Sequence, residues 1–220
     1  MRANERAHMT QRERMVAGVG GIGFAVLTFV GFGVASSPGG TYSASDVADY
    51  MAKGHHTAVF IALVLGVLSV LGLILLLVGL RERVTEGSFL ATVFATTSLV
   101  SVTGFAVGWA AWLAAPLSHA YGGSSVAIDP KVAYVILQVG AVIFFGVGAT
   151  FLGLSLITLM IGSAQTLPTW LRWFSLIVGV LGLASLAWIP FFPLLLWGLV
   201  IGIWLLASSR KTDTPAPQTT

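Results

Sequence analysis

The sequence predicts an all-α protein: a transmembrane bundle of six helices with both termini in the cytoplasm. Three observations lead to this prediction, namely the composition, the spacing of long apolar segments and the placement of Lys and Arg. Of the 220 residues, 56% are hydrophobic and only 9% are charged, whereas soluble domains carry about 25% charged residues. The mean hydropathy is +0.93, so the hydrocarbon core of a membrane is the expected solvent.

Six apolar segments are each long enough, or nearly so, to cross a hydrocarbon core about 30 Å thick. They are residues 15–35, 57–80, 89–115, 132–162, 171–189 and 191–208. The last two are separated only by the stretch from Pro190 to Pro193. A single helix through both would be nearly twice the core thickness, so we expect two short spans joined by a proline turn.

The placement of cations predicts the orientation of these spans. One set of connections and both tails carry nine cations: Arg2, Arg6, Arg12, Arg14, Arg81, Arg83, Arg172, Arg210 and Lys211. The alternate connections carry only Lys53 and Lys131, so the positive-inside rule places both termini in the cytoplasm. Tryptophans are expected as interfacial anchors, with Trp109, Trp112 and Trp188 at the outer boundary and Trp170, Trp173 and Trp204 at the inner one.

The expected domain organisation has three parts. Residues 1–14 form a basic cytoplasmic tail, residues 15–208 form the six-helix domain, with outer loops at about 36–56 and 116–131, and residues 209–220 form a disordered cytoplasmic tail. A cleavable signal peptide is the alternative for the start, because a basic region precedes an apolar run that ends in the small residues Gly33-Val34-Ala35-Ser36. About 20 apolar residues is long for such a peptide. Cleavage would leave five spans and an outer N-terminus.

Small residues recur at intervals of three and four along several segments, which places them on one helix face. The predicted packing residues are Gly21 in the first segment, Thr97, Ser101, Gly104 and Gly108 in the third, and Gly198 and Gly202 in the sixth. Such faces let helix backbones approach closely in lipid. We expect these contacts to form mainly within the chain.

Away from their ends, the six segments contain no Asp, Glu, Lys, Arg or His. Proton relays and ion pathways place ionisable groups inside the bundle, so a proton-coupled transporter is disfavoured. Transport of a small molecule or lipid is still the main alternative function. It would need a cavity near the hydroxyl-rich residues 96–103, lined by Thr97, Ser101 and Thr103, whereas tight contacts there would favour a scaffold.

Two helix-start signals lie in the outer loops. The spacing of Ser43 and Asp46 is typical of a capping box, and it predicts a short interfacial helix that ends near Lys53. The pair Asp129-Pro130 is typical of an N-cap followed by the first helical residue of the fourth span.

The outer loops also suggest a metal or pH-sensing site. Its candidate residues are His55, His56 and His119, with Asp46 or Asp49 as a further ligand. Adjacent residues of a helix point about 100° apart, so His55 and His56 seldom bind one ion together. No HxxxH or HExxH spacing occurs, and interfacial histidines that hydrogen-bond lipid, water or loop are the favoured interpretation.

We expect no enzyme activity, no cofactor and no nucleic-acid partner. The chain contains no cysteine, and Ser118-His119 lacks the G-x-S-x-G elbow of hydrolases. Gly18, Gly20 and Gly23 have the spacing of a dinucleotide fingerprint, but they follow a charged run where a strand is required, so no nucleotide site is predicted. The pI near 9.6 reflects cations between apolar runs and no basic patch interleaved with aromatics.

The stretch from Leu167 to Trp173, LPTWLRW, predicts an interfacial elbow before the fifth segment. Together with residues 42–56 and the closing WGLVIG, it resembles uncharacterised bacterial multi-pass membrane proteins in which an L-P-x-W-L-x-W elbow precedes the last two helices. The resemblance implies a six-helix protein of the bacterial cytoplasmic membrane. That family has no assigned activity, so no functional residue is transferred.

The leading expectation is therefore a non-enzymatic integral membrane protein with a structural, interaction or regulatory role. Its expected partners are membrane lipids and a protein partner or a second copy that meets a small-residue face. Transport is the first alternative, and an outer-face metal or pH-sensing protein is the second.

Overall fold

The computed structural model describes residues 10–35, 43–53, 55–84, 88–121, 128–187 and 191–210. Every regular element in these ranges is a helix, which confirms the predicted all-α class for the described part of the chain. The elements are α1 (Gln11–Ala35), α2 (Ala44–Ala52), α3 (His56–Arg81), α4 (Phe89–Tyr121), α5 (Pro130–Ala141), the π-helix η2 (Val142–Ala149), α6 (Thr150–Gly162), α7 (Thr169–Leu183), the 3₁₀ turn η3 (Ala184–Ala187) and α8 (Phe192–Arg210).

Three helices start with caps that the local sequence explains. The backbone N–H of Ser43 donates to the Asp46 carboxylate at 2.9 Å, and the N–H of Asp46 donates to the Ser43 hydroxyl at 3.3 Å, which confirms the predicted capping box of α2. Asp129 Oδ1 accepts from the N–H of Lys131 at 2.7 Å, which confirms the predicted start of α5.

The first helix begins earlier than predicted. Thr10 and Glu13 form a capping box before α1, with the Thr10 N–H donating to the Glu13 carboxylate at 2.6 Å. Arg12 and Arg14, predicted to lie in a basic tail, therefore belong to the first turn of α1. Residues 1–9 of that tail, and 211–220 of the C-terminal tail, lie outside the described residues.

Five helical stretches in the described part of the chain are long and apolar enough to cross a membrane. They are α1, Thr57–Arg81 of α3, Phe89–His119 of α4, Pro130–Gly162 formed by α5, η2 and α6, and Phe192–Ser209 of α8. The predicted fifth segment is shorter, because α7 has only 15 residues and then tightens into η3.

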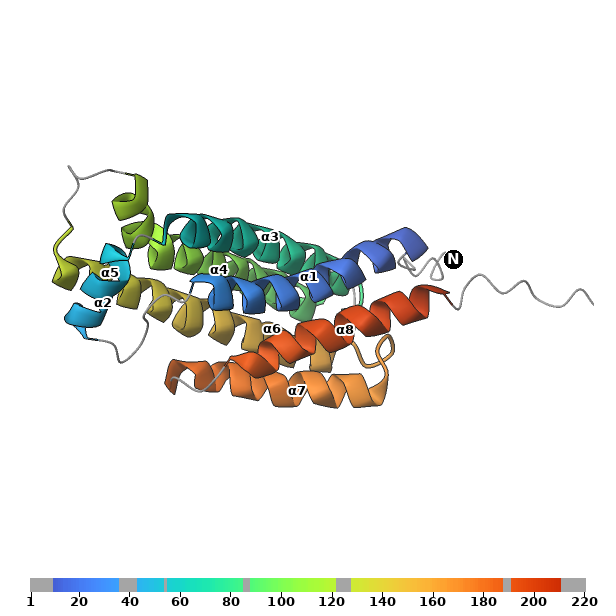
Figure 1. Ribbon diagram of the computed structural model, residues 1–220. Coiled ribbons are helices and arrows are strands. Elements are labelled where there is room, and N and C mark those ends of the chain that lie inside the picture. Colours follow the sequence, from blue (N-terminus) through green and yellow to red (C-terminus); the bar gives the residue numbers. More distant parts are fainter. Residues whose placement is uncertain are drawn as a thin grey trace, which may run out of the picture.

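The long helices run along one common axis, and α2 lies at one end of the bundle beside α5 (Figure 1). Helix α1 packs between α3 and α8, while α4 packs on α3 and along the continuous α5–η2–α6 helix. Helix α7 packs on α6 and also contacts α8. The start of α1 and the end of α8 lie at the same end of the bundle (Figure 1).

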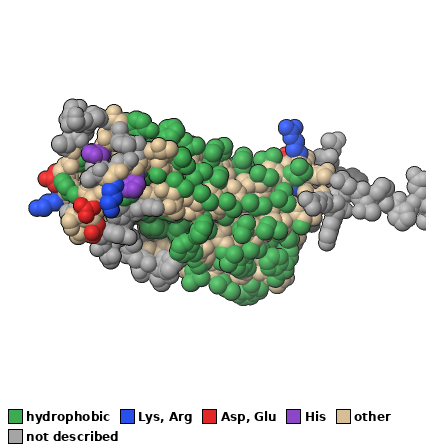
Figure 2. Space-filling model, in the orientation of Figure 1, with side chains coloured by type: hydrophobic (Ala, Val, Ile, Leu, Met, Phe, Trp, Pro, Cys, Tyr) green, Lys and Arg blue, Asp and Glu red, His purple; other side chains and the backbone are tan. Residues whose placement is uncertain are grey.

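The surface separates into an apolar band and two charged ends. Figure 2 shows hydrophobic side chains over the middle of the molecule and Lys, Arg, Asp, Glu and His side chains gathered at the ends. Many large hydrophobic residues of the long helices are exposed, among them Val19, Val67, Leu99 and Ile177. A water-soluble monomer rarely exposes so much contiguous apolar surface, so the chain has the surface of a helical membrane protein.

Helix α1 meets its two neighbours at backbone distance. A methyl group on Gly20 would lie 2.6 Å from the carbonyl oxygen of Gly72 in α3. A methyl group on Gly21 would lie 2.7 Å from the carbonyl oxygen of Gly198 in α8, and one on Gly202 would lie 2.7 Å from that of Gly18. Gly18, Gly20 and Gly21 are therefore packing residues, since only a missing side chain permits these distances.

Candidate functional site

The hydroxyl-rich part of α4 is the first candidate site, because the alternative function, transport, requires a cavity there. Ser101 is completely buried, and its hydroxyl donates to the carbonyl oxygen of Gly148 in η2 at 2.8 Å. One turn later, a methyl group on Gly104 would lie 2.5 Å from the backbone nitrogen of Gly148. A methyl group on Gly108 would lie 2.7 Å from Cα of Phe144. The two helix backbones are thus in direct contact along this face.

A second group of hydroxyls joins α4 to α6. Ser155 Oγ lies 2.9 Å from Thr97 Oγ1 and 3.3 Å from Ser98 Oγ. Thr103 faces the exterior and donates to the carbonyl of Leu99 in its own helix. The structure therefore brings Thr97 and Ser101 to the packed interface and turns Thr103 away from them.

The π-helix η2 is a feature that the sequence analysis missed. Its hydrogen bonds span five residues, and such stretches are rare and often mark functional positions. Gly148 lies within it, and its carbonyl accepts the Ser101 hydroxyl. A methyl group on Gly148 would lie 2.9 Å from the ring of Phe105. Residues 142–149 are apolar and show no local signal that separates a π-turn from an α-turn, so only the packing reveals it.

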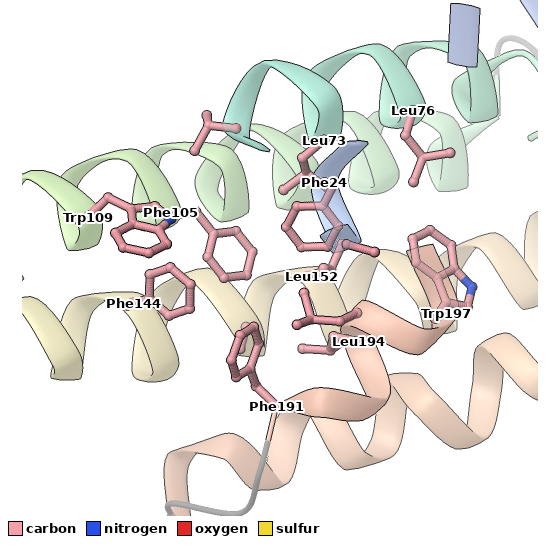
Figure 3. Close-up of a cluster of buried hydrophobic side chains, with 14 of the residues drawn as sticks. Phe24, Leu73, Leu76, Phe105, Trp109, Phe144, Leu152, Phe191, Leu194 and Trp197 are labelled. Atoms are coloured by element: carbon pink, nitrogen blue, oxygen red, sulfur yellow. The ribbon is translucent and has the colours of Figure 1, made fainter. Parts of the chain in front are cut away.

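An aromatic cluster occupies one half of the bundle. The ring of Phe32 lies 4.8 Å from that of Trp109, 4.9 Å from that of Trp112 and 5.3 Å from that of Phe144, measured between centroids. Figure 3 shows Phe105, Trp109, Phe144 and Phe191 gathered from α4, η2 and the residue before α8. These distances suit edge-to-face and offset-stacked pairs, which stabilise a core beyond their buried area.

The outer anchors predicted at Trp109 and Trp112 are instead part of this core. The two side chains are only 3% and 9% exposed. A methyl group on Gly66 would lie 2.9 Å from the Trp109 ring, so that glycine opens the space which the indole fills. Composition places Trp near a membrane boundary but does not say whether it faces lipid or a neighbouring helix.

The other predicted anchors have different surroundings. Trp170 and Trp173 are 55% and 54% exposed in the first turns of α7. Trp204 is partly buried beneath the guanidinium of Arg83, whose Cζ lies 5.7 Å from the ring centroid. Trp188 lies outside the described residues.

In the described part of the chain, the outer histidines and the nearby carboxylates form no three-residue group that could hold a metal ion. His55 stacks on Tyr50 with centroids 4.5 Å apart and an interplanar angle of 18°, while His119 lies in the last turn of α4. The side chain of His56 lies outside the described residues.

The Asp46 carboxylate and the Tyr50 phenol of α2 have structural roles. The Asp46 carboxylate accepts hydrogen bonds from the backbone and hydroxyl of Ser43, which lower the pKa of Asp46. The Tyr50 hydroxyl donates to the carbonyl of Ala35 at 2.5 Å, and burial raises the pKa of Tyr50 to about 12. Asp49 is exposed. Tyr50 therefore ties α2 to the end of α1.

Comparison of the chain with models of protein families, with curated proteins and with solved structures finds no match. The function of the protein has to be inferred from its own residues and contacts.

Proposed function

We propose that this chain is a non-enzymatic, multi-pass protein of the bacterial cytoplasmic membrane with a structural, interaction or regulatory role. The observation that carries the proposal is the backbone contact between α4 and η2. A transport path through this region would have to use the space beside Ser101 and Gly104. Gly148 of η2 fills that space, because its backbone contacts both residues. In lipid, hydroxyls and glycines at such positions hold helices together.

A six-span topology with both termini inside is part of the proposal. The 15 residues of α7 rise about 22 Å, and the four residues of η3 add about 8 Å. Together they match a hydrocarbon core of about 30 Å. The start of α1 and the end of α8 share one end of the bundle (Figure 1), as an even number of crossings requires.

We propose that the first helix is a membrane span that the mature protein keeps, and that it is not a cleaved signal peptide. Gly20 and Gly21 bring the α1 backbone against α3 and α8, and Phe24 is buried in the centre of the bundle (Figure 3). Removal of α1 would leave the facing glycines of α3 and α8 without a partner helix. These contacts support a mature protein that keeps this helix.

The proposed surface for a protein partner is the side of α4 that faces away from the bundle. Helix α4 is the least buried of the five long spans: 28% of an apolar 18-residue stretch of α4 is buried, against 44% for each of the others. Its exposed residues include small and hydroxyl side chains at intervals of three, four and seven, which share one helix face: Thr92, Thr96, Thr103, Ala106 and Ala110. Residues of this type favour close association of helices in lipid.

Site-specific photocrosslinking in native membranes tests this function. A photoreactive amino acid replaces Leu99, which is 67% exposed on α4, and in a matched control it replaces Ile177, which is 59% exposed on α7. We expect a discrete protein adduct from position 99 and none from position 177. The same adduct from both positions, or none from either, contradicts the proposed partner surface.

A transport assay tests the alternative. The purified chain is reconstituted in liposomes and the uptake of a panel of neutral solutes is compared with that of empty liposomes. We expect no difference. Uptake that depends on the protein, and that changes when Gly104→Leu perturbs the α4–η2 contact, would overturn the structural role in favour of transport.

A further inference from the structure

The end of the bundle where α1 begins and α3 ends is rich in guanidinium groups. Arg12 and Arg14 lie in the first turn of α1, Arg81 and Arg83 lie at and just after the end of α3, and Arg172 lies in the first turn of α7. The Glu13 carboxylate at this end is already used in the cap of α1. Among these cations, Arg12 and Arg81 are exposed, whereas Arg14 and Arg83 are partly buried.

Arg83 is held in a defined position by two neighbours. Its Nη1 donates to the carbonyl oxygen of Thr166 at 3.4 Å, and its guanidinium lies over the ring of Trp204. The Thr166 hydroxyl donates back to the carbonyl oxygen of Arg83 at 2.6 Å. Because these contacts already fix the Arg83 side chain, it loses little further conformational entropy when it binds a ligand, and this favours tight binding.

Arg14 approaches the same place from α1. Burial lowers the pKa of Arg83, and the charge of Arg14 lowers it further, while Glu82 raises it. A methyl group on Gly18, one turn after Arg14, would lie 2.8 Å from the Leu206 side chain of α8, and Arg83 lies over Trp204 of the same part of α8. Both arginines therefore lie beside the last turns of α8. In addition, Arg14 Nε is buried and makes no hydrogen bond within the described part of the chain. Arg172 differs, because its Nε donates to the carbonyl of Met160 at 3.0 Å.

We propose that Arg14 and Arg83 together bind a phosphate group, and that this phosphate is the headgroup phosphate of an anionic phospholipid. An anion between the two guanidinium groups would offset their repulsion and accept from the buried Nε of Arg14. Guanidinium groups match the geometry of phosphate oxygens and bind them by two parallel hydrogen bonds. Arg14 is in the first turn of α1 and Arg83 follows the last residue of α3, so the site lies at the end of two apolar spans, the depth at which lipid phosphates lie. Figure 2 shows charged side chains at the ends of the apolar band.

Lipid binding to the full-length protein tests this inference. The chain is purified in a neutral detergent, and native mass spectrometry measures its affinity for phosphatidylglycerol, for phosphatidylcholine and for inorganic phosphate. We expect phosphatidylglycerol to bind at least about tenfold more tightly than phosphatidylcholine, since a tenfold ratio corresponds to about 1.4 kcal/mol. This expectation is independent of whether the protein acts as a scaffold or as a transporter.

Matched variants separate a site from general surface charge. Arg14→Gln and Arg83→Gln each remove one partly buried cation, whereas Arg12→Gln and Arg81→Gln each remove an exposed cation two residues away. We expect the first two to weaken phosphatidylglycerol binding about tenfold and the last two to change it less than about twofold. Arg83→Lys keeps the charge but loses the planar fork, so we expect an intermediate loss.

Each outcome decides between the alternatives. Equal losses in all four Gln variants, or equal affinity for the two lipids, would overturn the site. Inorganic phosphate that binds as tightly as the lipid and displaces it would overturn the lipid as the source of the phosphate. Thermal unfolding in the same detergent checks that each variant is folded. Should Arg83→Gln not fold, Arg14→Gln against Arg12→Gln decides, because that pair leaves the contacts of Arg83 with Thr166 and Trp204 unchanged.

Discussion

Replacing Gly104 by alanine tests the backbone contact between α4 and η2. The new methyl carbon would lie 2.5 Å from the backbone nitrogen and 2.8 Å from Cα of Gly148. Carbon atoms pack at about 3.5–4.0 Å, so the two helices have to separate by about 1 Å. Backbone atoms cannot rotate away as a flexible side chain can, so the whole interface has to move.

The expected cost combines three effects. Overpacking of this kind costs about 1–3 kcal/mol. Separation also lengthens the Ser101–Gly148 hydrogen bond, now 2.8 Å, and an interhelical hydrogen bond in a membrane contributes about 0.6 kcal/mol on average. Alanine favours a helix over glycine by up to about 1 kcal/mol, which acts in the opposite direction. We expect a net loss of about 2 kcal/mol in the free energy of unfolding.

The assay is reversible unfolding in mixed micelles of sodium dodecyl sulfate and a neutral detergent, followed by circular dichroism. The matched control is Gly33→Ala in α1, because a methyl group at that position meets no atom of the described residues within 4 Å. We expect Gly33→Ala to be neutral or slightly stabilising. The proposed contact is refuted if Gly104→Ala unfolds at the same detergent fraction as Gly33→Ala.

Three further predictions use the same unfolding assay. Ser101→Ala removes the hydroxyl that donates to the carbonyl of Gly148 and should lower the free energy of unfolding by about 0.6–1.7 kcal/mol. Thr103→Ala removes an exposed hydroxyl that is bonded within its own helix and should change this free energy by less than about 0.5 kcal/mol. Equal effects of the two variants would contradict the interhelical role of Ser101. Thr28→Val should stabilise by about 1–2 kcal/mol, because the Thr28 hydroxyl is fully buried and has no hydrogen-bond partner in the described part of the chain; a loss of stability would reveal a partner for that hydroxyl. The pKa of Tyr50 is raised from 10.0 to about 12 in the folded protein, so its contribution is complete below pH 10 and is lost as the pH rises to about 12, by at most about 2.7 kcal/mol. Tyr50→Phe should abolish that part of the alkaline dependence, and an unchanged pH profile in this variant would show that another group causes it.

The sequence predicted the helices best where a local signal marks their ends. Ser43 with Asp46 and Asp129 with Pro130 specify helix starts through hydrogen bonds over two or three residues, so no tertiary information is needed. The start of α1 was missed although Thr10 and Glu13 carry the same signal. The charged residues between them and the apolar run made that turn look like a tail.

The predicted packing residues and the predicted anchors show a different limit. Periodicity indicates that Ser101, Gly104 and Gly108 share a helix face, but it does not name the helix opposite. That helix contains η2, whose Gly148 and Phe144 meet this face. The sequence likewise predicted Trp109 to lie at the membrane boundary. Its burial depends on Gly66, a glycine more than 40 positions away in the chain.

By itself, the amino-acid sequence determined the solvent of this protein and the positions of its long helices, because apolar composition and helix length act locally and add along the chain. The tertiary structure decided which helix meets which: α1 lies between α3 and α8, and α4 lies against the π-helix η2. Those pairings depend on side-chain shape across distant segments, and a close approach between backbones exists only when both partners are in place.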